Sequence, residues 1–244
     1  MTVVVVGSAR GAPGVTTASL LVAGELPGGV LVEADLDGGV LAARYGLGRE
    51  PGLTTFAAAR PGSPDAWRDH AQLAGGVPVV VGPDAPDNAT ALWARAGRAI
   101  GSSLGAADGT FVVDAGRYRA GGPLRQLGDV TRLTVVLARP LAEDVVALTH
   151  RLPALRSAGT PVALVTVGRG PYRPEDIAGQ LGVDLLGTLP SDERAARMLG
   201  EGGGSARALA RSALARAARD LAEAIDEIAH SAPDEAGTPA GVTQ

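Results

Sequence analysis

The chain has 244 residues, 45% of them hydrophobic, and a formal net charge of −4 at pH 7. This length allows one sizeable core, and the acidic balance provides no general attraction to nucleic acid or to an anionic membrane. The absence of cysteine excludes disulfide bonds and thiolate metal sites. The N-terminal apolar run has no basic region before it, and no apolar stretch approaches about 18 residues. We therefore expect neither export nor a membrane span, and a cytoplasmic location.

The first predicted elements are a buried strand, a tight loop and a helix. Residues 3–6 are four consecutive valines, glycine and other small residues follow, and a helical pattern covers residues 16–24. A loop of this kind directs backbone N–H groups and the positive end of a helix at one point. The sequence therefore predicts an anion site at this loop, most often one for a phosphate group.

The remaining chain predicts a sheet that is covered by helices on both faces. Apolar runs predict strands at residues 30–33, 77–81, 110–113, 133–138, 162–167 and 184–189. Amphipathic patterns predict helices at residues 88–103, 141–157, 174–181 and 205–229. This alternation indicates a doubly wound α/β fold with a mainly parallel sheet, whose ligand lies at the carboxyl ends of the strands.

Residues 60–76 are less regular and predict short surface helices. Trp67 and Trp93 are expected to pack in the core, and a partner surface is the less favoured alternative. We expect residues 1–230 to form a single domain. Residues 231–244, which are acidic and contain proline and glycine, are expected to form a disordered tail.

Acidic residues lie at the ends of two predicted strands. Asp35 and Asp37 follow one strand, and Asp114 ends another. A single aspartate at such a position is more often the cap of a turn or helix than a metal ligand. Three of them at strand ends favour a shared site, because the carboxyl ends of parallel strands meet at one edge of the sheet.

Residues 9–17, with the sequence ARGAPGVTT, resemble the deviant phosphate loop of the ParA/MinD family, whose pattern is GKGGVGKTT. Gly11, Gly14, Thr16 and Thr17 match the pattern. The resemblance implies a P-loop NTPase fold of the SIMIBI class and a nucleotide site formed by these four residues together with Val15. It also implies that the Thr16 hydroxyl binds Mg²⁺.

The acidic strand ends resemble the same family. Asp35 and Asp37 are similar to its DxD segment, whose carboxylates help to hold Mg²⁺ and the attacking water. Asp114 is similar to the Walker B aspartate, which reaches Mg²⁺ through water. The implied metal site is therefore Thr16, Asp35 and Asp114, and the implied catalytic residues are Asp35, Asp37 and Arg10.

The loop departs from the family pattern at its charged positions. Val15 replaces the phosphate-loop lysine, Arg10 replaces the signature lysine, and Pro13 has no N–H group to donate. The chain contains no lysine, but a general exchange of lysine for arginine would have placed arginine at position 15. A charge-assisted hydrogen bond contributes about 1.5–3 kcal/mol, and a lost cation typically costs about a hundredfold or more in phosphoryl-transfer rate. We therefore expect weakened or lost binding of ATP or ADP with Mg²⁺, and hydrolysis that is very weak or absent.

Two later segments also resemble the family. Residues 166–168 end a strand that carries an adenine-contacting asparagine in many relatives, and this chain lacks that asparagine. Residues 189–194 resemble a motif of MinD and of the pilus-associated CpaE/TadZ branch. Within this motif, Ser191 and Asp192 are expected to cap the following helix.

The C-terminal part of the chain differs from two kinds of relative. ParA proteins bind DNA through basic residues in this part, whereas MinD ends in a basic amphipathic helix that inserts into membrane. Here Asp220 and Glu223 dilute the charge of Arg207, Arg211 and Arg219, so a solvated helix face is favoured over a DNA-binding one. The acidic end argues against direct membrane insertion.

These features predict a divergent ParA/MinD-like protein, closest to the CpaE/TadZ and septum-site-determining branch. We expect a positioning or regulatory scaffold for a Tad-type pilus or the division site, which binds a protein partner and forms a homodimer in which Arg10 crosses to the partner's phosphates. Two alternatives remain open. One is an active Mg-ATP-dependent ATPase whose dimerisation is driven by nucleotide, and the other is a DNA-partitioning protein.

Overall fold

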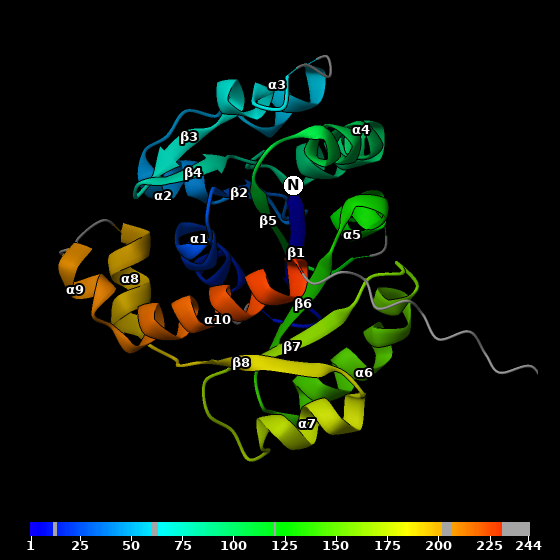
Figure 1. Ribbon diagram of the computed structural model, residues 1–244, viewed down its shortest axis with the longest axis vertical. Helices are drawn as coiled ribbons and strands as arrows, with labels where there is room; N and C mark the ends of the chain where they lie inside the picture. Colours follow the sequence, from blue (N-terminus) through cyan, green and yellow to red (C-terminus); the bar gives the residue numbers. More distant parts are fainter. Residues whose placement is uncertain (12–13, 60–62, 120, 202–205, 231–244) are drawn as a thin grey trace, which may run out of the picture.

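Figure 1 shows the computed structural model, which describes residues 1–11, 14–59, 63–119, 121–201 and 206–230. Its centre is one sheet with the strand order β3-β4-β2-β5-β1-β6-β7-β8. The strands are β1 (Thr2–Ser8), β2 (Gly29–Glu33), β3 (Gln72–Ala74), β4 (Val77–Val80), β5 (Thr110–Arg117), β6 (Leu133–Ala138), β7 (Val162–Val167) and β8 (Asp184–Leu189). Neighbouring strands are parallel except for the antiparallel pair β3 and β4. The predicted doubly wound, mainly parallel α/β fold is confirmed.

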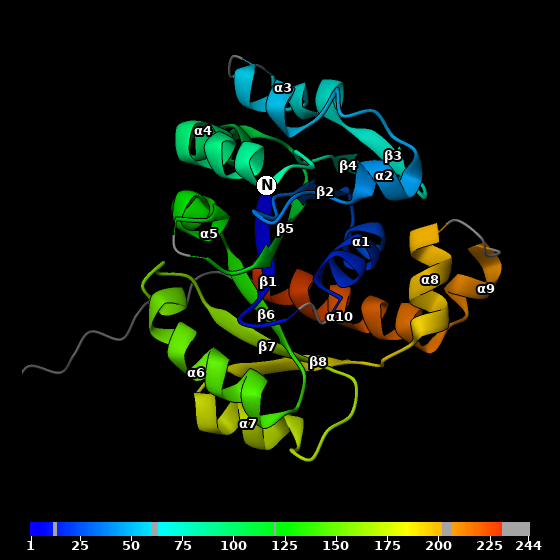
Figure 2. The ribbon, with the colours of Figure 1, turned by 180° about the vertical axis from the view of Figure 1, so that it is seen from behind.

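Helices cover both faces of this sheet, as Figures 1 and 2 show from opposite sides. One face carries α1 (Val15–Glu25), α2 (Leu41–Tyr45), α8 (Glu193–Glu201), α9 (Ala206–Ala210) and α10 (Ala213–His230). The other carries α3 (Leu53–Ala58), α4 (Pro86–Ala106), α5 (Pro123–Leu127), α6 (Ala142–Arg156) and α7 (Pro174–Leu181), with 3-10 helices at Ala66–His70 and Gly128–Val130. The sheet therefore separates two hydrophobic cores.

Strand β1 lies between β5 and β6 and is buried on both sides. Its valines alternate between the two cores, with Val3 and Val5 in one and Val4 and Val6 in the other. A central parallel strand needs apolar side chains on both faces, which explains the unbroken valine run. The carboxyl end of β1 consequently lies in the middle of the sheet edge, where the next loop begins.

The two tryptophans pack in the core on the α4 side, as predicted. Trp67 is 4% exposed and donates its Nε1 proton to the carbonyl of Asp108 at 2.9 Å. Trp93 lies on α4, is 1% exposed, and its Nε1 has no hydrogen-bond partner among the described residues.

The structure corrects the prediction for residues 60–76, of which it describes residues 63–76. A short helix is present at Ala66–His70, but it is followed by the unpredicted strand β3. This three-residue strand pairs with β4 through a turn at Gly75 and Gly76, both of which have positive φ angles of 59° and 91°. Two glycines at the centre of a two-residue turn are a strong hairpin signal, because both positions require positive φ.

The predicted helix at residues 205–229 is wrong in its continuity. The structure ends α9 at Ala210 and begins α10 at Ala213. The Ser212 hydroxyl oxygen accepts a hydrogen bond from the N–H of Ala215 at 3.0 Å, which is the geometry of a helix N-cap. The predicted tail, residues 231–244, lies outside the described residues. In the part of the chain that is described, no helix combines the length and apolar character needed to cross a bilayer.

Candidate functional site

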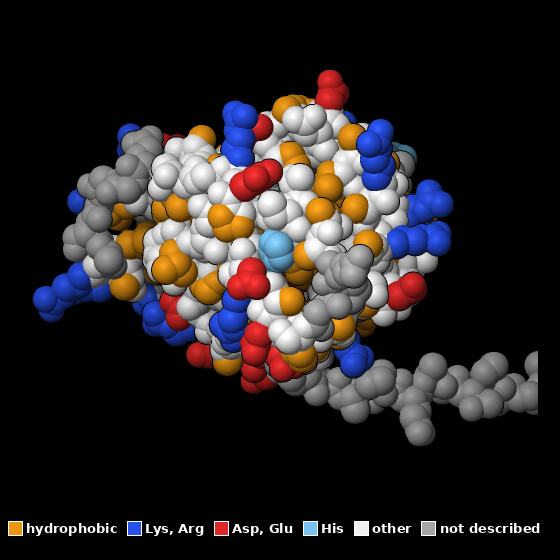
Figure 3. Space-filling model, turned by 90° about the horizontal axis from the view of Figure 1, so that it is seen from above, with side chains coloured by type: hydrophobic (Ala, Val, Ile, Leu, Met, Phe, Trp, Pro, Cys, Tyr) orange, Lys and Arg blue, Asp and Glu red, His pale blue; other side chains and the backbone are white. Residues whose placement is uncertain are grey.

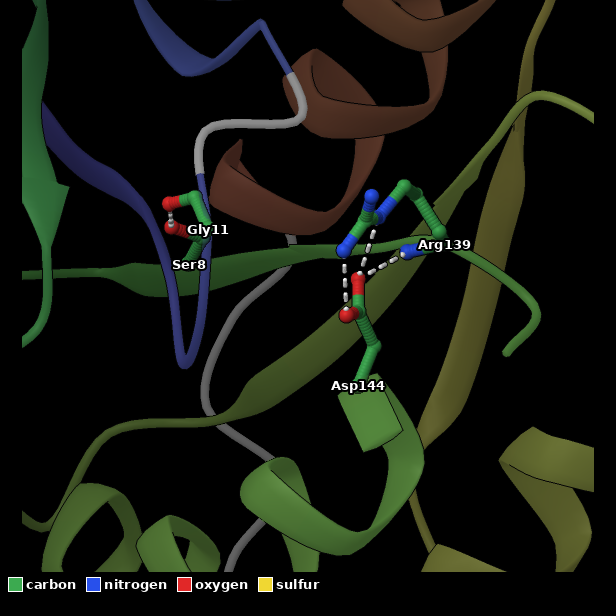
Figure 4. A network of polar contacts seen from close by, with 4 residues as sticks. All are labelled: Ser8, Gly11, Arg139 and Asp144. Atoms are coloured by element: carbon green, nitrogen blue, oxygen red, sulfur yellow. Dashed lines mark hydrogen bonds and ion pairs between the residues drawn. The ribbon is translucent and has the colours of Figure 1, made fainter. Parts of the chain in front are cut away.

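The loop after β1 has the backbone shape that an anion site needs. Gly11 and Gly14 adopt φ angles of 66° and 82°, which residues with a Cβ atom rarely adopt. Gly14 precedes α1, and its carbonyl accepts the first helical hydrogen bond from the N–H of Ala18 at 2.9 Å. The Ser8 hydroxyl lies 3.2 Å from the carbonyl oxygen of Gly11 and ties the start of the loop to its middle (Figure 4). The free N–H groups of the first helical turn therefore open toward the carboxyl edge of the sheet.

Tyr118 fixes the base of this loop. Its hydroxyl group lies 2.9 Å from the carbonyl oxygen of Val135 and 3.2 Å from that of Val5, and its N–H donates to the carbonyl of Ser8 at 2.8 Å. The ring lies so close to Gly7 that a Cβ atom there would be 2.8 Å from the nearest ring atom. Position 7 therefore has to be glycine, and the root of the loop is held from both neighbouring strands. No local pattern in the sequence indicates this role of Tyr118.

Asp114 lies beneath the loop and is completely buried. Its Oδ1 atom accepts a hydrogen bond from the N–H of Gly116 at 3.0 Å, whereas Oδ2 has no hydrogen-bond partner among the described residues. Burial raises the pKa of Asp114 to about 7, the nearby Thr16 hydroxyl opposes this rise, and the charge of Asp35 adds to it. A buried carboxylate oxygen without a partner is costly, so Oδ2 of Asp114 is available to a cation or to a hydrogen-bond donor.

Asp35 lies directly against the turn that follows Asp114. A Cβ atom on Gly116, whose φ angle is 56°, would be 2.0 Å from the carboxyl carbon of Asp35. Burial raises the pKa of Asp35, the charge of Asp37 adds to this rise, and the charge of Arg119 opposes it. The structure therefore brings together Thr16, Asp35 and Asp114, the three predicted metal ligands.

Asp37 lies at the rim of the site and is half exposed. Its N–H donates to Oδ1 of Asp35 at 2.8 Å, and its carboxylate forms an ion pair of 2.5 Å with Arg119. The carboxylate is thus engaged by Arg119. Its catalytic role stays a prediction.

Glu33 is a buried carboxylate that is not among the predicted site residues. It is 1% exposed and pairs with Asp114 in the register of β2 and β5. Its Oε1 atom accepts the N–H groups of Val40 and Leu41 at 2.6 and 2.9 Å, and Oε2 accepts that of Gly82 at 3.0 Å. Although these hydrogen bonds oppose it, burial raises the pKa of Glu33. Glu33 therefore holds the loop that carries Asp35, and a glutamate ending an apolar strand was its signal in the sequence.

The nucleotide residues predicted in the loop divide into buried and accessible ones. Val15, the first residue of α1, is 5% exposed and packs in the core between α1 and the sheet, whereas Arg10 is exposed. Gly14 and Thr17 line a pocket of about 390 Å³, which extends to Gly168 beyond β7. Pro13, expected to remove an N–H group, lies outside the described residues.

Arg139 and Asp144 also lie at this edge and were not predicted. Arg139 follows β6, lines the same pocket, and holds the carboxylate of Asp144 at the start of α6 through two side-chain hydrogen bonds (Figure 4). Burial alone would raise the pKa of Asp144, but its hydrogen bonds to Arg139 and the charges of Arg139 and Arg10 lower it. At the far side of the pocket, Oδ1 of Asp192 accepts the N–H of Ala195 at 2.9 Å, so the predicted cap of α8 is Asp192.

The residues of the site offer Mg²⁺ only a few protein oxygens. Among the described residues there is no cluster of three or more acidic or histidine side chains that would hold a metal by themselves. The Thr16 hydroxyl and the orphaned Oδ2 of Asp114 fit an ion that keeps several waters and takes further oxygens from a bound nucleotide, as Mg²⁺ commonly does.

Charges of both signs are mixed on the face drawn in Figure 3. These charged side chains are scattered among hydrophobic and uncharged ones over the described residues. On α10, Arg219 forms a bidentate pair with Glu25 at 3.0 and 3.3 Å, and Arg216 donates to the carbonyl of Arg211 at 2.7 Å. Two C-terminal arginines are thus engaged within the protein.

Comparison with known proteins relates the chain to one fold. No family model and no curated protein matches its sequence. Its structure is similar to that of the cell division ATPase MinD from Pyrococcus furiosus, with a TM-score of 0.76 and 20% identity over 93% of this chain and 99% of that one. MinD from Pyrococcus horikoshii OT3, solved with Mg-ADP, gives a TM-score of 0.74 and 18% identity over 94% and 97%. A ParA family ATPase from Chlorobium tepidum TLS gives 0.68 and 15% over 91% and 97%. The chain therefore has the ParA/MinD-type P-loop NTPase fold that the loop resemblance implies.

Proposed function

We propose that this protein is a divergent ParA/MinD-like nucleotide-binding protein with very weak or absent ATPase activity, which serves as a positioning or regulatory scaffold. The observation that carries the proposal is Val15, a buried apolar side chain at the position of the phosphate-loop lysine. The positive φ angles of Gly11 and Gly14 and the burial of Asp114 support a site that retains its backbone geometry and its acidic residue. In this proposal the site differs from that of the family by the loss of one cation.

A buried and a half-buried carboxylate support retained nucleotide binding, because without a bound cation their burial would destabilise the folded protein. Asp114 is buried with an unpartnered oxygen, and Asp35 lies against Gly116 in the turn that follows Asp114. Mg²⁺ with a nucleotide would offset this burial of negative charge, with Thr16 and Asp114 as its protein-side ligands, directly or through water. Gly11 and Gly14 let the backbone approach the phosphates.

Weak hydrolysis follows from what phosphoryl transfer requires. Catalysis of this reaction consists almost entirely of positioning and charge stabilisation. In this proposal Asp35 would orient a water molecule, but the start of α1 carries a buried valine where the family pattern has a cation. Loss of a preorganised charge of this kind costs about a hundredfold or more in rate. Binding, which depends on many backbone contacts, is reduced less.

The proposed role as a scaffold rests on the resemblance of residues 189–194 to MinD and to the CpaE/TadZ branch. In the structure this segment joins β8 to α8 and borders the pocket beside the phosphate loop. A partner of a Tad-type pilus or of the division site would therefore contact a surface that adjoins the nucleotide. We propose a homodimer in which the exposed Arg10 faces the second subunit's nucleotide.

The test is calorimetric titration with Mg-ATP and Mg-ADP, together with a steady-state phosphate-release assay. We expect weak binding by the wild type and binding about 10- to 100-fold tighter by Val15→Lys, because one charge-assisted contact is restored. Val15→Met is the matched control, since it adds length at the same buried position without charge. Turnover by the wild type that is abolished by Asp35→Ala would show an active ATPase instead. No binding by either the wild type or Val15→Lys would refute a nucleotide site.

A further inference from the structure

A positively charged side chain, that of Arg139, lies beside the phosphate loop, directly after the neighbouring strand β6. Strand β6 pairs with β1 up to Ser8 and Leu137, so the residues after β6 lie beside the loop that follows β1. Arg139 is the second residue beyond that pair. Its Nη2 atom would be 3.5 Å from a Cβ atom built on Gly11, in the middle of the loop. Figure 4 shows the guanidinium of Arg139 between this loop and the start of α6.

Asp144 holds this guanidinium in a fixed position. Oδ2 of Asp144 accepts the Nε proton and the backbone N–H of Arg139, each at 3.0 Å, and Oδ1 accepts from Nη2 at 2.8 Å. The Asp144 side chain is only 2% exposed, so the anchor itself is rigid. A planar guanidinium that is already ordered loses little further entropy when it binds a phosphate oxygen.

The arginine is fixed but remains open to a ligand. Its side chain is 43% exposed, and its Nη1 atom makes no hydrogen bond within the described part of the chain. It lines the pocket that also contains Gly14 and Thr17. The nearby charge of Arg10 also lowers the pKa of the Asp144 carboxyl group, so Asp144 stays ionised as the partner of Arg139.

We infer that Arg139, positioned by Asp144, is the cation that contacts the phosphates of the bound nucleotide in place of a lysine at position 15. This inference rests on the proposed nucleotide site and names a residue from a different strand as its phosphate ligand. The phosphate oxygens would accept hydrogen bonds from Nη1 of Arg139 and from the second proton of Nη2, because Asp144 accepts only one of the two Nη2 protons. The base and the ribose would contact the rest of the pocket.

The test compares Mg-ATP, Mg-ADP and adenosine binding by calorimetry in the wild type, Arg139→Gln and Arg219→Gln. Arg219 is the matched control, because it forms a bidentate pair with Glu25, is 46% exposed, and lies at the opposite end of α1 from the loop. We expect Arg139→Gln to weaken Mg-ATP binding about 10- to 100-fold and to leave adenosine binding unchanged. Arg219→Gln should bind all three as the wild type does.

A second measurement separates a phosphate contact from a structural role. If Arg139 contacts the phosphates, Val15→Lys should restore Mg-ATP affinity in the Arg139→Gln background and give a larger gain there than its gain in the wild type, so the two changes are non-additive. Equal Mg-ATP binding by the wild type and Arg139→Gln refutes the inference and leaves the nucleotide site standing. A parallel loss of adenosine binding, without rescue, also refutes it. If Val15→Lys binds Mg-ATP and the wild type does not, the inference is refuted and the nucleotide site stands; if neither protein binds Mg-ATP, both are refuted.

Discussion

Replacing Asp114 with asparagine should stabilise the protein at neutral pH and have a much smaller effect in acid. Burial raises the pKa of Asp114 from 3.8 to about 7. Between these two values the folded state binds a proton that the unfolded state has released, so the wild type loses stability as the pH rises. The loss is complete above pH 7 and absent below about pH 4.

The expected size follows from that pKa difference. About three pH units at roughly 1.4 kcal/mol each give up to about 4 kcal/mol for the charged, buried Asp114. Asparagine keeps the oxygen that accepts the N–H of Gly116 and removes the charge. The stability advantage of Asp114→Asn should therefore grow by about 2–3 kcal/mol between pH 5 and pH 8.

The assay is urea unfolding at pH 5, 6, 7 and 8, with a chelator present and no nucleotide. Asp184→Asn, which changes an exposed aspartate on β8, serves as the control and should follow the wild-type pH profile. Any fixed cost of the new amide is the same at each pH, so the pH dependence of the difference is the readout. A difference between Asp114→Asn and the wild type that stays constant from pH 5 to pH 8 would refute the reasoning.

Three further predictions concern the framework around the site. Glu33→Gln should lower the free energy of unfolding by about 1–3 kcal/mol in urea titrations, because an amide NH₂ group would face one of three backbone N–H donors; an unchanged midpoint would contradict this. Trp67→Phe should cost more stability than Trp93→Phe, since only Trp67 loses a hydrogen bond; the reverse order in thermal unfolding would count against the assigned contacts. Gly116→Ala should displace the carboxyl group of Asp35 and weaken Mg-ATP binding measured by calorimetry, and wild-type affinity would show that Asp35 is not needed.

The parts of the fold that the sequence predicted are those with long local patterns. Strands β6 and β7 begin and end where their apolar runs do, because a buried parallel strand needs apolar residues on both faces. The edge strand β8 also has the predicted bounds, although it is only partly buried. Strand β3 was missed because three residues contain no readable period. Helices α2 and α3 were missed for the same reason, since five and six residues form a helix only when Leu41, Leu53 and Phe56 are packed against the rest of the protein.

In the candidate site, too, the residues predicted from the sequence are those that belong to a continuous local pattern. Gly11, Gly14, Thr16 and the aspartates are visible in the sequence because the loop and the strand ends are short, continuous segments. Glu33 and Arg139 were not found, because their roles depend on contacts made only after folding. The partner of Glu33 at Gly82 is 49 residues away, and Arg139 meets Gly11 across more than half of the chain.

Tyr118 packs against Gly7 and so fixes the position of the loop root, whereas other residues determine the charge of the loop. Since Tyr118 holds the root of the loop through backbone carbonyls of β1 and β6, the position of Gly7 and Ser8 needs neither a ligand nor a lysine to persist. A protein engineer can therefore adjust affinity here by editing charge alone, with the root of the loop as a constant background.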